Sequence, residues 1–245
     1  MEAKTKEIYG LSFFDGTLKE AVAFAREKMK SGAVTVATPN PEILWRALKD
    51  PALYRALKNA SLLLPDGVGV IFASKILKKP LAGKIAGVEF GEAVLAAAAQ
   101  NGESVYFLGG KAGVAEKAAG KMSEKYPGFR VAGCGDGYFQ NDDEAFLKIK
   151  ESGAEIAFLC LGFPKQEILM EKHRGDGGAA LSMALGGSLD VYAGTAKRAP
   201  GWMIRLNLEW FYRLLSQPSR LGRMMKIPLF LLYTVKCRFF GWKQK

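Results

Sequence analysis

A carboxylate at the end of an apolar run is the residue of this sequence best placed to do chemistry. The stretch LLLPDGVGV, residues 62–70, contains three leucines followed by Pro65, Asp66 and Gly67. A carboxylate at the tip of a buried strand can accept a proton from a hydroxyl group that attacks an activated carbon. Pro-Asp-Gly is also an ordinary turn sequence, so this segment alone leaves both interpretations open.

Further loops rich in glycine or polar residues also follow apolar, strand-like runs. They are Thr38-Pro39-Asn40, Gly109-Gly110-Lys111, Gly162-Phe163-Pro164-Lys165-Gln166 and Gly186-Gly187-Ser188. Glycine lets the backbone approach a ligand closely, and the N-terminus of a following helix favours an anion. The segment LGGKAGVA therefore suggests a cradle for a nucleotide diphosphate. It matches neither GxGxxG nor GxxxxGK[ST], and because tight turns also use glycine, a purely structural role stays open.

Other residue types that often carry catalysis are sparse. We interpret the single histidine, His173, as a cation at the C-terminus of a helix rather than as a catalytic base. The three cysteines are unpatterned, which argues against a disulfide framework or a zinc site and favours a reducing, cytoplasmic compartment. Asp142 and Asp143 begin a helix, and no GxSxG or HExxH motif occurs, so we expect chemistry without a metal or other cofactor.

The elements that would position these residues alternate between helices and strands. Thr17 and Glu20 form a capping-box pattern, and Asn40-Pro41 and Asp50-Pro51 are typical helix starts. Short apolar runs separate the helices, namely AVTVAT, SLLLP, SVYFLGG, AEIAFLCLG and AALSMALGG. This alternation predicts a Rossmann-like α/β fold with a mostly parallel sheet and helices on both faces. In such a sheet, ligands bind beyond the carboxyl ends of the strands.

Positive charge is concentrated at the C-terminal end of the 245-residue chain. Residues 197–245 contain 11 of the 35 Lys and Arg residues but one of the 24 acidic residues. A four-residue repeat places an apolar helical stripe on Trp202, Leu206, Trp210 and Leu214. The longest uncharged run within residues 197–245, Ile227 to Val235, is nine residues, whereas a membrane-spanning helix needs about 20.

This distribution predicts an α/β catalytic domain over residues 1–196 and a basic, amphipathic helical appendage over residues 197–245. Such segments lie in the headgroup region of an anionic membrane. The apolar stripe could instead dock on the catalytic domain. Basic and aromatic residues also suit nucleic acid, but here they are confined to an apolar segment, so we expect no nucleic-acid partner. The polar start MEAKTKEIYG lacks a following apolar region, so we expect no signal peptide.

Six segments together resemble the WecG/TagA/CpsF family of glycosyltransferases. In family order they are VATPNPEIL, LLLPDGVGVIFASK, YFLGGKAGVAEKAA, CLGFPKQE, GGSLDVYAGTAKRAP and LEWFYRLLSQPSRLGR, and the resemblance covers about Thr5 to Arg223. It implies a metal-independent, inverting enzyme, peripheral on the cytoplasmic face of the membrane. The expected reaction moves N-acetylmannosamine from its UDP donor to N-acetylglucosaminyl-diphospho-undecaprenol, as in synthesis of the teichoic acid linkage unit.

The resemblance also implies roles for individual residues. Asp66 matches the family's proposed general base, Thr38 and Asn40 match polar residues that line the same pocket, and Gln166 matches a residue needed near the donor. The arginines matching Arg213, Arg220 and Arg223 are thought to close over the active site and hold the lipid diphosphate. The remaining expected substrate-binding positions are Lys84, Gly109, Gly110, Lys165 and Arg198.

Three positions depart from the family pattern and leave the identity of the sugar open. Lys84 replaces a usual arginine, Glu89 a commoner aspartate and Asn207 a commoner glycine; lysine keeps the charge but loses the guanidinium fork. N-acetylmannosaminuronic acid, glucose and glucuronic acid are alternative donor sugars, and the oligomeric state is open.

Two other classes of function remain as alternatives. A nucleotide-sugar or dinucleotide oxidoreductase would need an acidic ribose-binding residue about 20 residues past a glycine-rich first turn, and we do not find that pair. The other alternative is a non-enzymatic module that binds lipid or nucleic acid. Tight binding of a random oligonucleotide that persists at physiological salt would favour this class.

Overall fold

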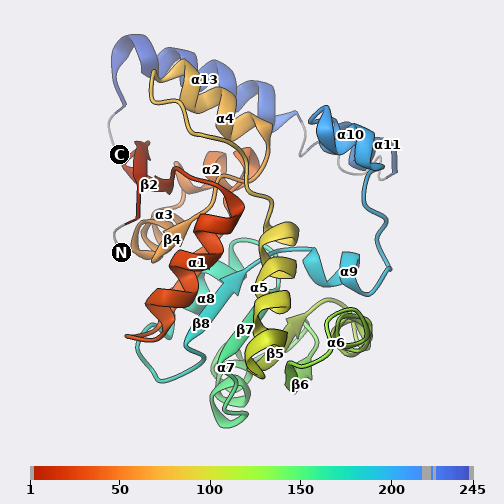
Figure 1. Cartoon of the computed structure of the whole chain (residues 1–245). Helices are drawn as coiled ribbons and strands as arrows, with labels where there is room; N and C mark the ends of the chain where they lie inside the picture. The colour runs from red at the N-terminus through yellow and green to blue at the C-terminus, as the bar shows by residue number, and fades with distance from the viewer. Residues whose placement is uncertain (1–2, 217–221, 223–224, 243–245) are drawn as a thin grey trace.

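The computed structural model describes residues 3–216, 222 and 225–242. Within these residues an eight-stranded sheet has the order β1-β2-β4-β3-β8-β7-β5-β6 (Figure 1). The strands are β1 Thr5–Ile8, β2 Leu11–Phe14, β3 Val34–Ala37, β4 Leu62–Leu63, β5 Ser104–Gly109, β6 Arg130–Gly135, β7 Ile156–Cys160 and β8 Leu181–Ala184. The β1–β2 pair is antiparallel and the other pairings in the sheet are parallel, which confirms the predicted mostly parallel sheet.

Helices cover both faces of this sheet, as predicted. One face packs against α1 Leu18–Met29, α5 Gly87–Asn101, α6 Val114–Lys125 and α9 Ser188–Tyr192. The other packs against α2 Pro41–Ala47, α3 Pro51–Asn59, α4 Val68–Ile76, α7 Asp142–Glu151, α8 Lys165–Lys172 and α13 Lys226–Phe240. Because successive strand side chains point to opposite faces, Phe158 lies in the first core while Ala157 and Leu159 lie in the second.

The predicted helix starts are confirmed. Thr17 Oγ1 accepts a hydrogen bond from the Glu20 amide at 3.3 Å, and a Glu20 carboxylate oxygen accepts from the Thr17 amide at 2.7 Å. Asn40 caps α2 by accepting from the Ile43 amide at 3.0 Å, and Asp50 caps α3 in the same way. These caps satisfy backbone amides at the starts of α1, α2 and α3.

The N-terminal hairpin of β1 and β2 was missed in the sequence. Its two turn residues, Tyr9 and Gly10, have φ angles of 53° and 70°, and the flanking residues Ile8 and Leu11 pair. Positive φ at both central residues is typical of a type I′ hairpin turn. The Tyr9 hydroxyl donates to Thr234 on α13 at 2.6 Å, a contact that stabilises the residue in this unfavourable conformation.

The C-terminal segment forms α10 Gly201–Arg205, α11 Glu209–Ser216 and α13. The predicted single stripe from Trp202 to Leu214 is wrong, because the helix breaks at Asn207, whose φ is 61°. The Asn207 amide donates to the Ile204 carbonyl at 3.0 Å, and the next amide donates to the Met203 carbonyl at 2.8 Å. This is the Schellman arrangement, in which glycine or asparagine takes the left-handed position.

Helix α13 packs against α2 and α4, whereas α10 and α11 lie to one side of the sheet at the end of an extended segment (Figure 1). Phe230, Thr234 and Cys237 of α13 are buried, so this helix contributes to the second core. Among the described residues, no helix is both long enough and apolar enough to cross a bilayer. The division of the chain at residue 196 stays a prediction.

Candidate active site

The loops after β4, β3, β8 and β7 are neighbours, because these strands lie in that order in the sheet. The chain leaves β3 and β7 towards α2 and α8 on one face, but leaves β8 towards α9 on the other. In open α/β sheets, ligands bind where neighbouring connections leave on opposite faces. The residues in these four loops are therefore the candidate site.

Asp66 lies in the loop after β4 and is half-buried. Its Oδ2 accepts a hydrogen bond from the Gly87 amide at 3.3 Å, and its own amide donates to the Pro39 carbonyl at 3.4 Å. Gly87 is the first residue of the 15-residue helix α5, whose N-cap residue Ala86 makes no side-chain cap. Asp66 therefore lies at the positive end of the α5 helix dipole.

Thr38 contacts the same backbone from the end of β3. It is 6% exposed, and its Oγ1 donates to the Ala184 carbonyl at the end of β8 at 3.0 Å. A Cβ atom added to Gly87 would lie 3.0 Å from Thr38 Oγ1, so Gly87 packs directly on this side chain. Gly87 was not predicted as a site residue from the sequence. The available signal was a glycine at the start of a helix that has no capping side chain.

Asn40 is two residues past Thr38, and its Oδ1 accepts from the Ile43 amide in the α2 cap. The backbone at Lys84 runs beside the Asp66 loop, because the adjacent Ile85 amide donates to the Pro65 carbonyl at 2.8 Å. The structure thus brings Asp66 and Thr38 together at Gly87, and backbone hydrogen bonds place the segments that carry Asn40 and Lys84 beside them.

Gln166 joins the two neighbouring loops. It is 2% exposed, and its Oε1 accepts from the Gly162 amide at 3.2 Å and from the Gly186 amide at 3.0 Å. Gly162 follows β7, and Gly186 lies two residues past Ala184, which bonds Thr38. Gln166 therefore acts as a clamp between the loops after β7 and β8.

Glu167 is a buried carboxyl group that sequence reasoning missed. It is 2% exposed, and its Oε1 accepts from Gln166 Nε2 at 2.8 Å. Burial raises the pKa of Glu167 to about 7, although hydrogen bonds from Gln166 and from its own amide oppose this shift. Its position directly after Gln166 in the segment PKQE was the only sequence signal.

The backbone itself requires the two glycines at the end of β5, Gly109 in the strand and Gly110 directly after it. Gly109 has a φ of 138°, and an added Cβ would lie 2.2 Å from the Cys160 carbonyl oxygen of β7. Gly110 has a φ of 74°, and an added Cβ would lie 2.7 Å from Val114. These contacts support the structural interpretation of the loop, and its role as a phosphate cradle stays a prediction.

Lys165 begins α8 and faces α7. Its Nζ lies 3.5 Å from Asp142 Oδ1 and 3.5 Å from the centre of the Phe139 ring. The ion pair and the cation–π contact hold this charge at the N-terminus of α7. Substrate contact by Lys165 therefore stays a prediction.

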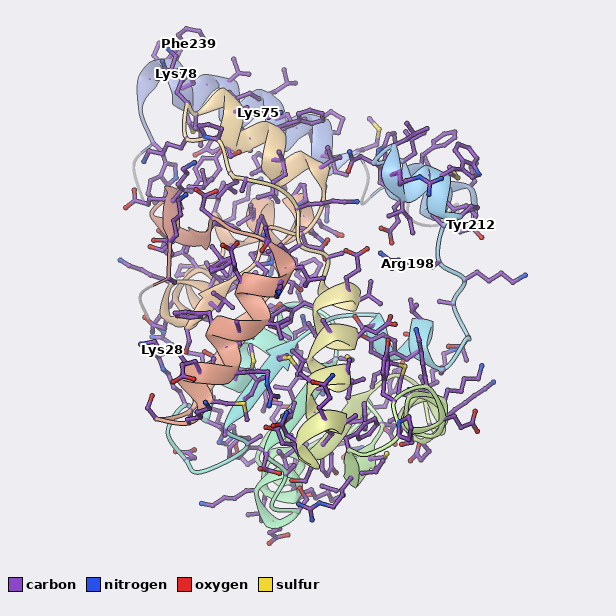
Figure 2. All side chains as sticks on the ribbon, in the orientation of Figure 1. Lys28, Lys75, Lys78, Arg198, Tyr212 and Phe239 are labelled. Carbon is purple, nitrogen blue, oxygen red and sulfur yellow. The ribbon has the colours of Figure 1, made fainter. Side chains whose placement is uncertain are left out.

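Arg198 links the segment after α9 to two helices. Its guanidinium group pairs with Glu89 in the first turn of α5, and its Nε lies 3.9 Å from Glu209 Oε1 at the start of α11. Figure 2 shows Arg198 between α5 and the α10–α11 pair. Arg213 lies in α11, and Arg220 and Arg223 lie outside the described residues.

His173 follows the last residue of α8, which confirms its predicted position at a helix C-terminus. Its ring stacks on Phe146 at 4.1 Å, and its nitrogens lie 2.9 Å from carboxylate oxygens of Asp143 and Asp176.

Burial raises the pKa values of Cys134 and Cys160 to about 11 and about 12, so both thiols stay protonated. In the described part of the chain, no group of three or more His, Cys, Asp or Glu residues could hold a metal ion.

Comparison with known proteins gives one consistent result. The model of the glycosyl transferase WecG/TagA/CpsF family matches residues 6–244. A Bacillus subtilis relative is 36% identical over 236 residues, which is 95% of this chain and 92% of the relative, and a Staphylococcus aureus (strain MW2) relative is 35% identical over 238 residues, with the same two shares. Both are named N-acetylglucosaminyldiphosphoundecaprenol N-acetyl-beta-D-mannosaminyltransferase.

Proposed function

The chain belongs to the WecG/TagA/CpsF family of glycosyl transferases, and on that premise we propose that it transfers N-acetylmannosamine from UDP-N-acetylmannosamine to N-acetylglucosaminyl-diphospho-undecaprenol. The names of the relatives support this sugar and this acceptor. One observation in the structure supports the proposal: Asp66 and Thr38 both contact Gly87. Thr38 also bonds the end of β8, and Gln166 clamps the loop that follows β8. A teichoic acid linkage unit or a related cell-surface polysaccharide is the product class we propose.

Asp66 acts as the general base in this proposal. Its carboxylate takes the proton of the acceptor hydroxyl while that oxygen bonds to the anomeric carbon of the donor. The bond from this carbon to UDP breaks on the opposite face, UDP leaves with the electron pair, and the configuration inverts. Such a base contributes about 10²–10⁴-fold to the rate. The amide of Gly87 supports the role, because it fixes one carboxylate oxygen.

The diphosphates need compensating charge, and we assign it to cations of this chain rather than to a metal. We assign part of this charge to Lys84, because it is the cation nearest in sequence to Gly87, which Asp66 contacts. The loop at Gly110 leads into the N-terminus of α6, and a helix N-terminus favours an anion. Arg213, Arg220 and Arg223 of the appendage are assigned to the lipid diphosphate, which guanidinium groups can bind in a bidentate manner. The Arg198 ion pairs would hold α11 beside α5 in this arrangement.

We further propose that the protein binds the inner face of the cell membrane through α13 and α4. The outer side of α13 exposes apolar side chains, with Leu232 at 67% and Phe239 at 77%. Figure 2 shows Phe239 at the same end of the molecule as Lys75 of α4 and Lys78, two residues past the end of α4. Helix α4 packs against α13. Exposed apolar side chains beside lysines suit insertion into the headgroup region of anionic lipid.

A panel of UDP-sugars tests this function. The full-length protein is incubated with one polyprenyl-diphosphate-linked N-acetylglucosamine analogue and each donor in turn, with and without EDTA, and the product is identified by mass spectrometry. We expect transfer from UDP-N-acetylmannosamine that EDTA does not reduce. If N-acetylmannosaminuronic acid, glucose or glucuronic acid is transferred in preference, the UDP derivative of that sugar is the donor instead. The absence of transfer from every donor would contradict the proposed reaction.

A further inference from the structure

Glu167 is an unusual group to find buried at the edge of the candidate site. Its Oε1 is bonded by Gln166, and its Oε2 has no hydrogen-bond partner among the residues that the structure describes. No Lys or Arg of the described part of the chain forms an ion pair with it. Burial of such a carboxyl group destabilises a folded protein. Groups of this kind are found where function requires them at the expense of stability.

The hydrogen bonds of Glu167 determine how the Gln166 amide can point. The Gly162 and Gly186 amides are donors, so they require the oxygen of the Gln166 side chain. Glu167 Oε1 accepts a hydrogen bond from this side chain, so Glu167 requires the NH₂ group. The amide satisfies all three partners in one orientation. Removing the acceptor at position 167 would leave a buried NH₂ group without this partner, which costs free energy and loosens the orientation.

The clamp acts on backbone that reaches the candidate base. Gly162 and Gly186 have φ angles of 76° and 54°, so each begins a sharp turn directly past its strand. Gly186 lies two residues past Ala184, whose carbonyl accepts from Thr38. Thr38 in turn packs on Gly87, whose amide bonds Asp66. These contacts form a continuous path from the loop after β8 to the Asp66 contact.

We propose that Glu167 is a positioning residue, whose carboxylate orients the Gln166 amide and through it holds the loops after β7 and β8 in the geometry that binds the donor. Glu167 itself does not touch the substrate. The part of this inference that concerns the donor rests on the proposed function, whereas the part that concerns the clamp does not.

Amide hydrogen exchange tests the clamp without any substrate. Exchange at Gly162 and Gly186 is followed by NMR on ¹⁵N-glycine-labelled full-length protein. We expect about tenfold faster exchange at both amides in Glu167→Met, the loss equivalent to one hydrogen bond. Glu167→Gln keeps a neutral oxygen acceptor and should restore most of the protection. Glu171→Gln, the same change one turn further along α8, serves as the control and should leave both amides unchanged. Unchanged protection in Glu167→Met would overturn the clamp.

Kinetics with the donor test the positioning role. We expect Glu167→Met to raise KM for the donor about tenfold and Glu167→Gln to stay near wild type, while urea unfolding shows both variants folded. Faster exchange at the two glycines with unchanged kinetics would overturn the positioning role. Should wild type itself fail to use UDP-N-acetylmannosamine, the exchange result still decides whether Glu167 orients Gln166, so the two failures are distinguishable.

Discussion

Replacement of Glu167 by glutamine should stabilise the protein in a pH-dependent manner. Burial raises the pKa of this carboxyl group from its ordinary value of 4.5 to about 7. A group whose pKa is higher in the folded state favours folding when it is protonated, and that contribution is lost as the pH rises through the folded-state pKa. Glutamine has nearly the same shape but does not titrate, so Glu167→Gln removes this loss.

The size of the effect follows from the shift. Each unit of pKa corresponds to about 1.4 kcal/mol, so a rise from 4.5 to about 7 costs the wild type about 3 kcal/mol once the group is ionised in both states. We therefore expect the free energy of unfolding of Glu167→Gln to be about 3 kcal/mol higher than that of the wild type at about pH 8. The difference should fall below about 1 kcal/mol near about pH 5.

Urea unfolding across this pH range measures the difference, and Asp15 supplies a contrasting variant. Burial alone would raise the pKa of Asp15, but the hydrogen bond and charge of Lys6, 3.0 Å away, and the Ala82 amide outweigh burial and lower it. The stability from Asp15 is present above its unfolded-state pKa and is lost as the pH falls, so Asp15→Asn should destabilise most at high pH. A Glu167→Gln variant that is less stable than wild type at high pH would refute the reasoning.

Three further predictions concern the parts around the site. Gly109→Ala should lower the free energy of unfolding by about 2–3 kcal/mol, because its Cβ meets a carbonyl oxygen at 2.2 Å, and an unchanged urea midpoint would contradict that contact. Arg198→Gln should remove the pair with Glu89 and speed hydrogen exchange of residues 201–216 in mass spectrometry; equal exchange would show that the ion pair does not hold α10 and α11. Leu232→Glu should weaken cosedimentation with phosphatidylglycerol vesicles at least about tenfold, whereas Leu147→Glu on α7, a comparably exposed leucine at 48%, should not; equal binding of both variants would remove α13 as the contact.

The fold was predictable from local signals in the sequence. Helices α1, α2 and α3 start at the predicted capping residues Thr17, Asn40 and Asp50, because a side-chain oxygen three residues before a backbone amide is enough to mark the start. The apolar runs between helices are too short for helices and became parallel strands. Such signals need no knowledge of the tertiary structure.

Two local misses have a tertiary or conformational cause. The turn residue Tyr9 is not a typical type I′ residue, and its positive φ is stabilised by contacts with α13, more than 200 residues away in the sequence. Asn207 interrupted the predicted apolar stripe because asparagine tolerates the left-handed conformation that ends a helix. A periodicity count sees neither effect.

The site was predictable in part. The rule that ligands bind at the carboxyl ends of parallel strands selected Asp66, Thr38 and Asn40, and the structure brings these residues together. The strand order places β8 between β3 and β7 and depends on long-range pairing, so the clamp that Gln166 makes between the loops after β7 and β8 was not visible in the sequence. The pairing of Arg198 with Glu89, 109 residues apart, was missed for the same reason.

The most direct test of the account is turnover by Asp66→Asn beside a matched control. Asp136 also follows a strand and precedes a glycine, but it is exposed, and its Oδ1 accepts from the Tyr138 amide in its own loop. Asp136→Asn therefore controls for the chemical change. We predict that Asp66→Asn lowers kcat at least about 10²-fold with UDP binding by calorimetry unchanged, and that Asp136→Asn matches wild type. Near-normal turnover by Asp66→Asn would contradict the assignment of this carboxylate as the base.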